Sequence, residues 1–337
     1  HWVRLLIWTL GLEKAPFMKF MRRIIHLWNA NGKTFTVLYL KECNRILMHF
    51  ISGNAILKTS EMPITLKGGL PGIIPGNLRS RIRDFDPVII RGVLTMLQIY
   101  RVISIPGKLK LNTITDPFKG LNPTLPKYDL RESIGSLFPD FNRKIIRHYP
   151  ISLLSLVSAG ANHSTSILGI WKDILAWESN PLLRTHLENF CSRWPGGDSF
   201  LNLINLERDS ILNIYPIELL NRVFKLGENL HLGRLSLKSE AAGKIRVFAI
   251  TDLITQSVMA PLSKVIFSLL KGLPMDGTFN QSAPLTRLVD LYQQGVLKGK
   301  VFYSYDLSAA TDRLPITLQK DILSLLIGDK MATSWLH

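Results

Sequence analysis

Two carboxylates that could hold a metal ion lie in the segment V-F-Y-S-Y-D-L-S-A-A-T-D-R-L-P, residues 301–315. Asp306 follows alternating β-branched and aromatic residues, a pattern that predicts a short buried strand over 301–305. Asp312 follows a run of small residues, and Pro315 suits the first turn of a helix because its missing N–H needs no partner there. Mg²⁺ binds few carboxylates together with phosphate oxygens and water, so this strand-to-helix corner could be a magnesium site.

The same two residues also have a simpler interpretation. Asp312 could serve only as an N-terminal helix cap, and Asp306 could be a solvated residue at a strand end. Short motifs carry a large risk of false positives, so the segment taken alone favours this structural interpretation.

Basic residues that could bind phosphate lie upstream. Residues 233–250 contain two alternating runs separated by the tight sequence A-A-G, which is typical of a β-hairpin. Lys244 and Arg246 fall on one strand face, and Lys238 adds a third positive charge if the hairpin forms. Lys offers a point charge and Arg a planar fork for phosphate oxygens. Taken alone, a Lys/Arg pair on an edge strand more often protects against aggregation.

Three segments resemble the RNA-dependent RNA polymerases of mitoviruses, which are small RNA replicons of fungal and plant mitochondria. Y-D-L-S-A-A-T-D-R-L-P (305–315) is similar to motif A of that family, and K-S-E-A-A-G-K-I-R-V-F-A-I-T-D (238–252) is similar to its motif F. D-G-T-F-N-Q (276–281) resembles a signature between them. Three signatures in the expected order are much more specific than any one of them.

The resemblance implies a role for each candidate residue. It gives Asp306 the role of ligand to the catalytic metal and Asp312 a role in recognising the ribose of the incoming nucleotide. It implies that the basic residues Lys238, Lys244 and Arg246 bind the triphosphate of the incoming nucleotide. It also implies a Mg²⁺ or Mn²⁺ cofactor, an RNA template and product, ribonucleoside triphosphate substrates, viral RNA replication and a mitochondrial location.

The implied reaction is nucleotidyl transfer, in which a 3′-hydroxyl attacks the α-phosphate of the nucleotide. Two metal ions about 3.5–4 Å apart stabilise the attacking and leaving oxygens in such reactions. Catalysis would then come mostly from positioning and from stabilisation of charge.

Parts of the family pattern are missing after Asp312. Motif B, a Gly/Ser-rich loop and helix, and motif C, G-D-D, have no match there. I-G-D-K (327–330) follows motif A too closely and has Lys330 in place of the second Asp, so we interpret it as a helix end. We therefore expect an incomplete α+β fold, consisting of right-hand polymerase fingers and the start of the palm. We also expect a fragment that is inactive by itself, either viral or a relic in a plant genome.

The positive charge is concentrated in the first part of the chain. The 337 residues include 41 Lys and Arg against 25 Asp and Glu, a net charge of +16. Residues 1–150 hold 23 basic and 9 acidic residues, whereas residues 151–337 hold 18 and 16. Solvated helix faces or an anionic membrane surface could explain this asymmetry, but we favour nucleic acid as the partner.

No run approaches the ~18 consecutive apolar residues of a membrane helix, so we expect no integral membrane segment. Cys43 and Cys191 are far apart and lack a C-x-x-C pattern. This argues against a disulfide framework and against a zinc site.

Residue patterns divide the chain into elements that would position these sites. The proline-rich residues 112–130 predict a loop and the best boundary. A helix that Thr251 or Asp252 could cap and that Gly272 ends, and a second helix over 284–294 with its apolar residues inward, are expected to brace the basic hairpin. The predicted parts are a basic, mostly helical region (1–125), a helical fingers region (126–232), fingers with the basic hairpin (233–300), and the first palm strand and helix (301–337).

Arg79, Arg81 and Arg83 occupy alternate positions. In a strand they would share one face and could form a row of phosphate contacts, so we predict that they bind RNA. A solvated basic surface explains the pattern equally well.

Two other functional classes remain open. A noncatalytic RNA-binding protein would keep the basic first half without the chemistry, and would show strongly salt-dependent RNA binding with no nucleotide incorporation. A reverse transcriptase or intron maturase shares the palm, and its product would be DNA.

Overall fold

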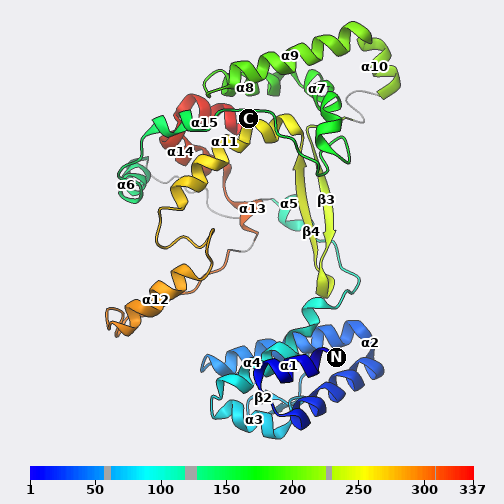
Figure 1. Cartoon of the computed structure of the whole chain (residues 1–337), viewed down its shortest axis with the longest axis vertical. Helices are drawn as coiled ribbons and strands as arrows, with labels where there is room; N and C mark the ends of the chain where they lie inside the picture. The colour runs from blue at the N-terminus through cyan, green and yellow to red at the C-terminus, as the bar shows by residue number, and fades with distance from the viewer. Residues whose placement is uncertain (57–61, 118–126, 225–229, 308) are drawn as a thin grey trace. The chain divides into compact units, whose positions relative to one another are not determined.

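The computed structural model describes residues 1–56, 62–117, 127–224, 230–307 and 309–337 (Figure 1). These residues are mostly helical and include two small two-stranded sheets, which is compatible with the predicted α+β class. The chain forms two compact units: the first unit consists of His1–Lys110 and Leu237–Val247, and the second of Leu111–Ser236 and Phe248–His337. The predicted four-part division stays a prediction.

The first unit is built on the helix α2 (Lys14–Ile51), which is interrupted at Gly32 with φ 78°. Buried residues on its inner face include Phe17, Phe20 and Leu40. A Cβ atom on Gly92 would lie 2.9 Å from the side chains of Leu12 and Phe17, so the α4 backbone packs directly on this core. The other elements of the unit are α1 (Trp2–Leu10), β1 (Leu66–Lys67), β2 (Leu70–Pro71), α3 (Gly76–Arg83), α4 (Pro87–Leu97) and η1 (Gln98–Val102). The helices α1 and α2 agree with the mostly helical character predicted for the N-terminal region.

The second unit is a helical assembly whose core lies along α11 (Leu253–Leu270). Ile254, Val258 and Val265 of this helix are fully buried. Its other elements are α5 (Asn112–Thr115), α6 (Lys127–Leu137), η2 (Arg143–His148), η3 (Ser166–Gly169), α7 (Ile170–Glu178), α8 (Pro181–Cys191), α9 (Gly197–Ile214), α10 (Ile217–Phe224), α12 (Ala283–Gln293), α13 (Ala310–Arg313), α14 (Ile316–Ile327) and α15 (Asp329–Leu336). I-G-D-K (327–330) ends α14, as predicted.

One helix among the described residues, α11, has the length and apolar composition that could cross a membrane. Core helices of soluble proteins meet the same test. In the second unit α11 packs its buried face into the core, together with Phe190, Leu323 and Leu326.

The predicted β-hairpin is confirmed. β3 (Gly233–Ser239) pairs with β4 (Ile245–Thr251), and η4 (Ala241–Gly243) forms the turn between them. Ala242 and Gly243 have φ values of 59° and 71°. Gly243 adopts this conformation without steric cost, whereas it is unfavourable for the alanine at 242. The tip of the hairpin belongs to the first unit and its base to the second.

Three predictions about elements were wrong. Residues 301–307 form no strand, and Tyr303 and Tyr305 are 75% and 86% exposed. A strand needs a neighbour to satisfy its backbone groups, and the described sheets provide none for this segment. The helix α12 forms as predicted but buries no residue, so its apolar residues do not face a core. Residues 112–130 include α5 and the beginning of α6, and residues 118–126 lie outside the described part.

Candidate functional site

The predicted phosphate-binding residues lie together at the tip of the hairpin. Lys238, Lys244 and Arg246 are all exposed. Arg246 Nε lies 2.7 Å from Glu240 Oε1. The hydrogen bond from Arg246, with the nearby charges of Lys244 and Lys238, holds the pKa of Glu240 below its usual value. Three cations therefore surround one carboxylate within the first unit.

Sequence reasoning missed Glu240. The signal was present, because a single acidic residue stands inside the basic segment K-S-E-A-A-G-K-I-R. The ion pair orients the Arg246 guanidinium when no anion is bound. A triphosphate that binds Arg246 must compete with Glu240 for it.

Close backbone contacts hold the hairpin tip in the first unit. The Ala242 N–H donates to the carbonyl oxygen of Ile103 over 2.9 Å. A Cβ atom on Gly107 would lie 2.7 Å from Ile245 Cγ1 and 2.8 Å from the Gly243 oxygen. Only glycine at position 107 allows this approach, so the basic residues at the tip are held by the loop that follows η1.

Polar side chains hold the base of the hairpin in the second unit. The Asp252 N–H donates to the Leu232 oxygen over 2.9 Å. The Asn162 side chain donates from Nδ2 to the His231 carbonyl oxygen and accepts at Oδ1 from the His231 N–H, each over 2.9 Å. Asn162 Nδ2 also donates to Asp173 Oδ1 over 2.7 Å. The segment A-G-A-N-H-S, which resembles a flexible joint in the sequence, therefore fixes the start of β3.

Two buried carboxylates continue this network where β4 meets α11. Asp252 caps α11, as predicted, by accepting from the Thr255 N–H. It also accepts from Trp177 Nε1 over 3.0 Å, and Asp173 accepts from the Leu253 N–H over 2.8 Å. Burial raises the pKa of both carboxyl groups, although their hydrogen bonds act in the opposite direction.

The two units are expected to respond differently as the pH falls. Asp173 and Asp252 have raised pKa values, so the folded second unit binds more protons than the unfolded chain. Its unfolding free energy should rise as the pH falls from those raised values towards the ordinary Asp pKa. In the first unit the pKa values of Asp86 and Glu240 are lowered, mainly by hydrogen bonds from the Ile89 N–H and from Arg246. Their contribution, present above the ordinary carboxyl pKa, is lost as the pH falls through the lowered values.

Pulse proteolysis with fragment identification, repeated over a pH series, measures the stability of each unit separately. A parallel loss of stability in both units between neutral pH and about pH 5, above the ordinary carboxyl pKa values, would contradict this expectation.

The predicted acidic pair lies in an exposed part of the second unit. Asp306 belongs to the irregular segment 301–307, and Asp312 belongs to α13. Asp312 caps neither α13 nor α14, whose N-cap residues are Ala309 and Pro315. The guanidinium of Arg313 donates to the Asn112 and Asp116 oxygens over 2.6 and 2.8 Å, which ties α13 to α5.

Metal binding by these carboxylates requires further ligands. Among the described residues there is no group of three or more His, Cys, Asp or Glu side chains placed to hold a metal ion. Asp306 and Asp312 are exposed and offer oxygen ligands of the kind that Mg²⁺ prefers. A magnesium ion held there would take its remaining ligands from water and from substrate phosphate.

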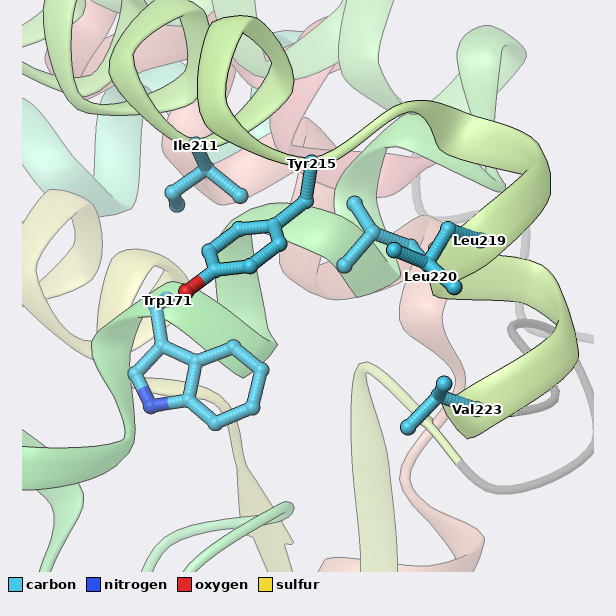
Figure 2. A pocket seen from close by; sticks show the side chains of 6 residues that line it. All are labelled: Trp171, Ile211, Tyr215, Leu219, Leu220 and Val223. Atoms are coloured by element: carbon cyan, nitrogen blue, oxygen red, sulfur yellow. The ribbon is translucent and has the colours of Figure 1, made fainter.

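An apolar pocket of the second unit contains none of the predicted residues (Figure 2). It lies in the second unit and has a volume of about 470 Å³. Its walls come from α7, α9 and α10 and carry Trp171, Ile211, Tyr215, Leu219, Leu220 and Val223. Such a lining suits an apolar ligand and not a triphosphate.

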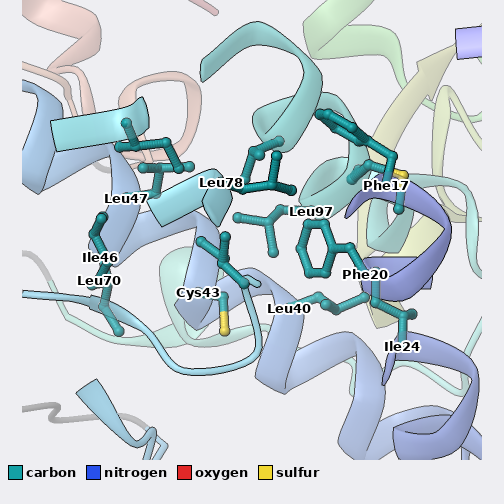
Figure 3. Packing of buried hydrophobic residues seen from close by; sticks show 14 of the residues in the cluster. Phe17, Phe20, Ile24, Leu40, Cys43, Ile46, Leu47, Leu70, Leu78 and Leu97 are labelled. Atoms are coloured by element: carbon teal, nitrogen blue, oxygen red, sulfur yellow. The ribbon is translucent and has the colours of Figure 1, made fainter. Parts of the chain in front are cut away.

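The predicted row of arginines was wrong because residues 76–83 form the helix α3 and not a strand. Residues two apart on a helix point about 200° apart, so Arg81 faces away from Arg79 and Arg83. Arg81 pairs with Glu13 at 2.8 Å and with Asp86 at 2.5 Å. Leu78 and Ile82 are the buried residues of α3, and Figure 3 shows Leu78 within the core of the first unit.

Comparisons with known proteins agree with the resemblance seen in the motifs. The family model described as Mitovirus RNA-dependent RNA polymerase matches residues 148–337. The RNA-directed RNA polymerase of Cryphonectria parasitica mitovirus 1 is 29% identical over 348 aligned positions, which cover 99% of this chain and 42% of that protein. An uncharacterized mitochondrial protein of Arabidopsis thaliana is 38% identical over 66 residues, or 20% of this chain and 24% of that protein.

No solved structure matches the chain. The chain spans less than half the length of the viral polymerase. The family match covers more than half of the chain and includes both the hairpin with its basic tip and the acidic pair. The chain therefore belongs to the mitovirus RNA-dependent RNA polymerase family.

Proposed function

We propose that the chain forms the fingers and the start of the palm of an RNA-directed RNA polymerase. The observation that carries the proposal is the gathering of Lys238, Lys244 and Arg246 around Glu240 at the hairpin tip. Three cations on a hairpin that is held at both ends suit the triphosphate of an incoming ribonucleotide. The reaction is template-dependent transfer of a ribonucleotide to the 3′ end of RNA, and we propose it for a longer polypeptide of the length of the viral relative, of which this chain covers 42%.

The proposal also gives the acidic pair of the second unit a role. Asp306 would hold a magnesium ion, and Asp312 would contact the ribose of the nucleotide. When bound, the metal ion supplies charge stabilisation at the phosphate that reacts. The exposed residues 301–305 have the alternating pattern of a strand, and we infer that they pair with palm strands in the longer polypeptide.

The proposed location is the mitochondrion, and the proposed process is replication of viral RNA. Two relatives support this: one is a mitovirus polymerase and the other is described as a mitochondrial protein. RNA is the proposed partner of the basic first unit, with Arg79 and Arg83 as contacts. Arg81 has a structural role there, because two carboxylates already bind it.

Binding of a ribonucleoside triphosphate to the chain, measured with and without Mg²⁺, tests this proposal. We expect Arg246→Gln to weaken binding about tenfold, since a hydrogen bond to a charged group is removed. We expect Asp306→Asn to remove the part of the affinity that depends on Mg²⁺. Asp290→Asn is the matched control, because Asp290 is exposed on α12 and lies outside the proposed site.

Equal effects of Asp306→Asn and Asp290→Asn would contradict the metal role. We expect the chain alone not to incorporate ribonucleotides on an RNA template, and incorporation that Asp306→Ala abolishes would overturn this expectation. RNA binding without any nucleotide binding would favour the noncatalytic class. A preference for deoxyribonucleotides would favour a reverse transcriptase.

A further inference from the structure

Two arginines of the first unit donate hydrogen bonds to the segment that joins β1 to α3. Arg23 of α2 donates from Nη1 to the Ile73 oxygen over 2.9 Å. Arg83 of α3 donates from Nη2 to the Lys67 oxygen over 3.0 Å. The Arg83 guanidinium lies directly against Gly68, where a Cβ atom would collide with it. The two guanidinium groups therefore hold opposite ends of the segment 67–73.

A third arginine, Arg79, lies on the same face of α3 as Arg83. It differs from Arg23 and Arg83 in its hydrogen bonding. Its Nε and Nη1 atoms are buried and have no hydrogen-bond partner among the residues that the structure describes. Burial, and then the charges of Arg83 and Arg23, lower the pKa of Arg79. Buried donors without partners are rare and destabilising, more so when they carry charge.

Two acidic residues of the first unit are already paired elsewhere. Glu13 and Asp86 both pair with Arg81 on the other side of α3. Among the described residues, Arg79 therefore keeps two donors without a partner, and the positive charges of Arg83 and Arg23 lie close enough to act on it, an arrangement that an anion would complete.

We propose that Arg23, Arg79 and Arg83 form a binding site for one phosphate group of an RNA backbone. Guanidinium groups match phosphate oxygens in geometry and have donors but no acceptors. Residues 1–110 hold 17 Lys and Arg against 5 Asp and Glu, so the unit attracts polyanions in preference to single small anions. Arg79 and Arg83 were predicted contacts, and the structure adds Arg23 and excludes Arg81. The site rests on the proposed function only in that RNA is the ligand.

Binding of a labelled single-stranded RNA of about 12 nucleotides, titrated over a range of salt concentrations, tests the site. We expect Arg79→Met and Arg23→Gln each to weaken binding about tenfold. The slope of log affinity against log salt should become shallower by about 0.7 for each phosphate that the variant no longer neutralises. Arg22→Gln and Arg91→Gln are matched controls, because both arginines are exposed and each substitution removes one positive charge, as Arg79→Met and Arg23→Gln do. We expect them to change the affinity less than twofold, and equal reductions in all four variants would overturn the site.

Thermal unfolding of the same variants separates a binding role from a structural one. Arg79→Met removes a buried charge that has no partner, so its melting temperature should equal or exceed that of the unchanged protein. Arg81→Met, which breaks two ion pairs, should lower it. A lower melting temperature of Arg79→Met together with unchanged RNA affinity would show that Arg79 is structural and overturn the site.

Three further measurements identify the ligand. Binding of a ribonucleoside triphosphate should be unchanged in Arg79→Met, so an absence of triphosphate binding in every variant counts against the polymerase proposal and not against this site. Inorganic phosphate should compete only at concentrations far above those of RNA, and equal competition would overturn the RNA assignment. A loss of binding to anionic phospholipid vesicles, with RNA affinity unchanged, would assign the site to a lipid headgroup instead.

Discussion

Replacing Asp252 with alanine is expected to lower the unfolding free energy of the second unit by about 3 kcal/mol, because a helix cap is removed and a buried donor is left unpaired. The carboxylate is fully buried and accepts from Trp177 Nε1, from the Thr255 N–H and from Thr255 Oγ1. After the substitution Trp177 Nε1 has no partner in the core. Urea unfolding followed by tryptophan fluorescence measures the change.

Two further variants show which property of Asp252 matters. Asp252→Asn keeps one acceptor oxygen and removes a charge that burial disfavours, so it should cost about 1 kcal/mol or less. Trp177→Phe removes the indole donor, and combining it with Asp252→Ala should cost less than the two single changes added together. If asparagine were as destabilising as alanine, the charge itself would be required, contrary to the expectation.

Replacing Gly107 with alanine is expected to weaken the attachment of the hairpin tip to the first unit by about 2 kcal/mol, typical of overpacking. The new Cβ atom would lie 2.8 Å from the Gly243 oxygen, which is backbone and cannot rotate away. Because the tip carries Lys244 and Arg246, triphosphate affinity should fall with it. The rate of proteolytic cleavage after Lys244 reports the attachment directly and should increase.

Gly135→Ala is the control for this substitution, because Gly135 lies in α6 and a Cβ atom there would meet nothing within 4 Å. We expect no change in cleavage at the hairpin for this variant. If Gly107→Ala changed neither cleavage nor triphosphate affinity, the loop after η1 would not hold the tip.

The sequence was most informative where structure is decided by neighbouring residues. The hairpin over 233–250, the Asp252 cap and the helix end at 327–330 were predicted correctly because alternation, cap residues and glycine act locally. The segment G-N-L-R-S-R-I-R fits both a strand and a helix period when only its arginines are considered. The spacing of Leu78 and Ile82, four apart, was the signal that would have favoured the helix.

The remaining differences come from contacts between residues far apart in the sequence. Asn162 and His231 are 69 positions apart, so no local pattern marks Asn162 as the residue that fixes the start of β3. The pattern of 301–305 indicates a strand, but whether a strand forms depends on a partner elsewhere in the chain. Glu240 was missed for a different reason, because the basic residues around it dominate the pattern of that segment.

The division of the hairpin between two units has a consequence for synthesis on the ribosome. Residues up to Lys110 are made early, but the first unit is completed by Leu237–Val247, whose last residue is made 137 residues later. Because the ribosome adds about 5–20 residues per second, the first unit stays incomplete for on the order of ten seconds until its last segment has been made. During that interval the surface of Ile105 and Gly107 that later receives Gly243 is uncovered, and a chaperone that binds nascent chains would find it available.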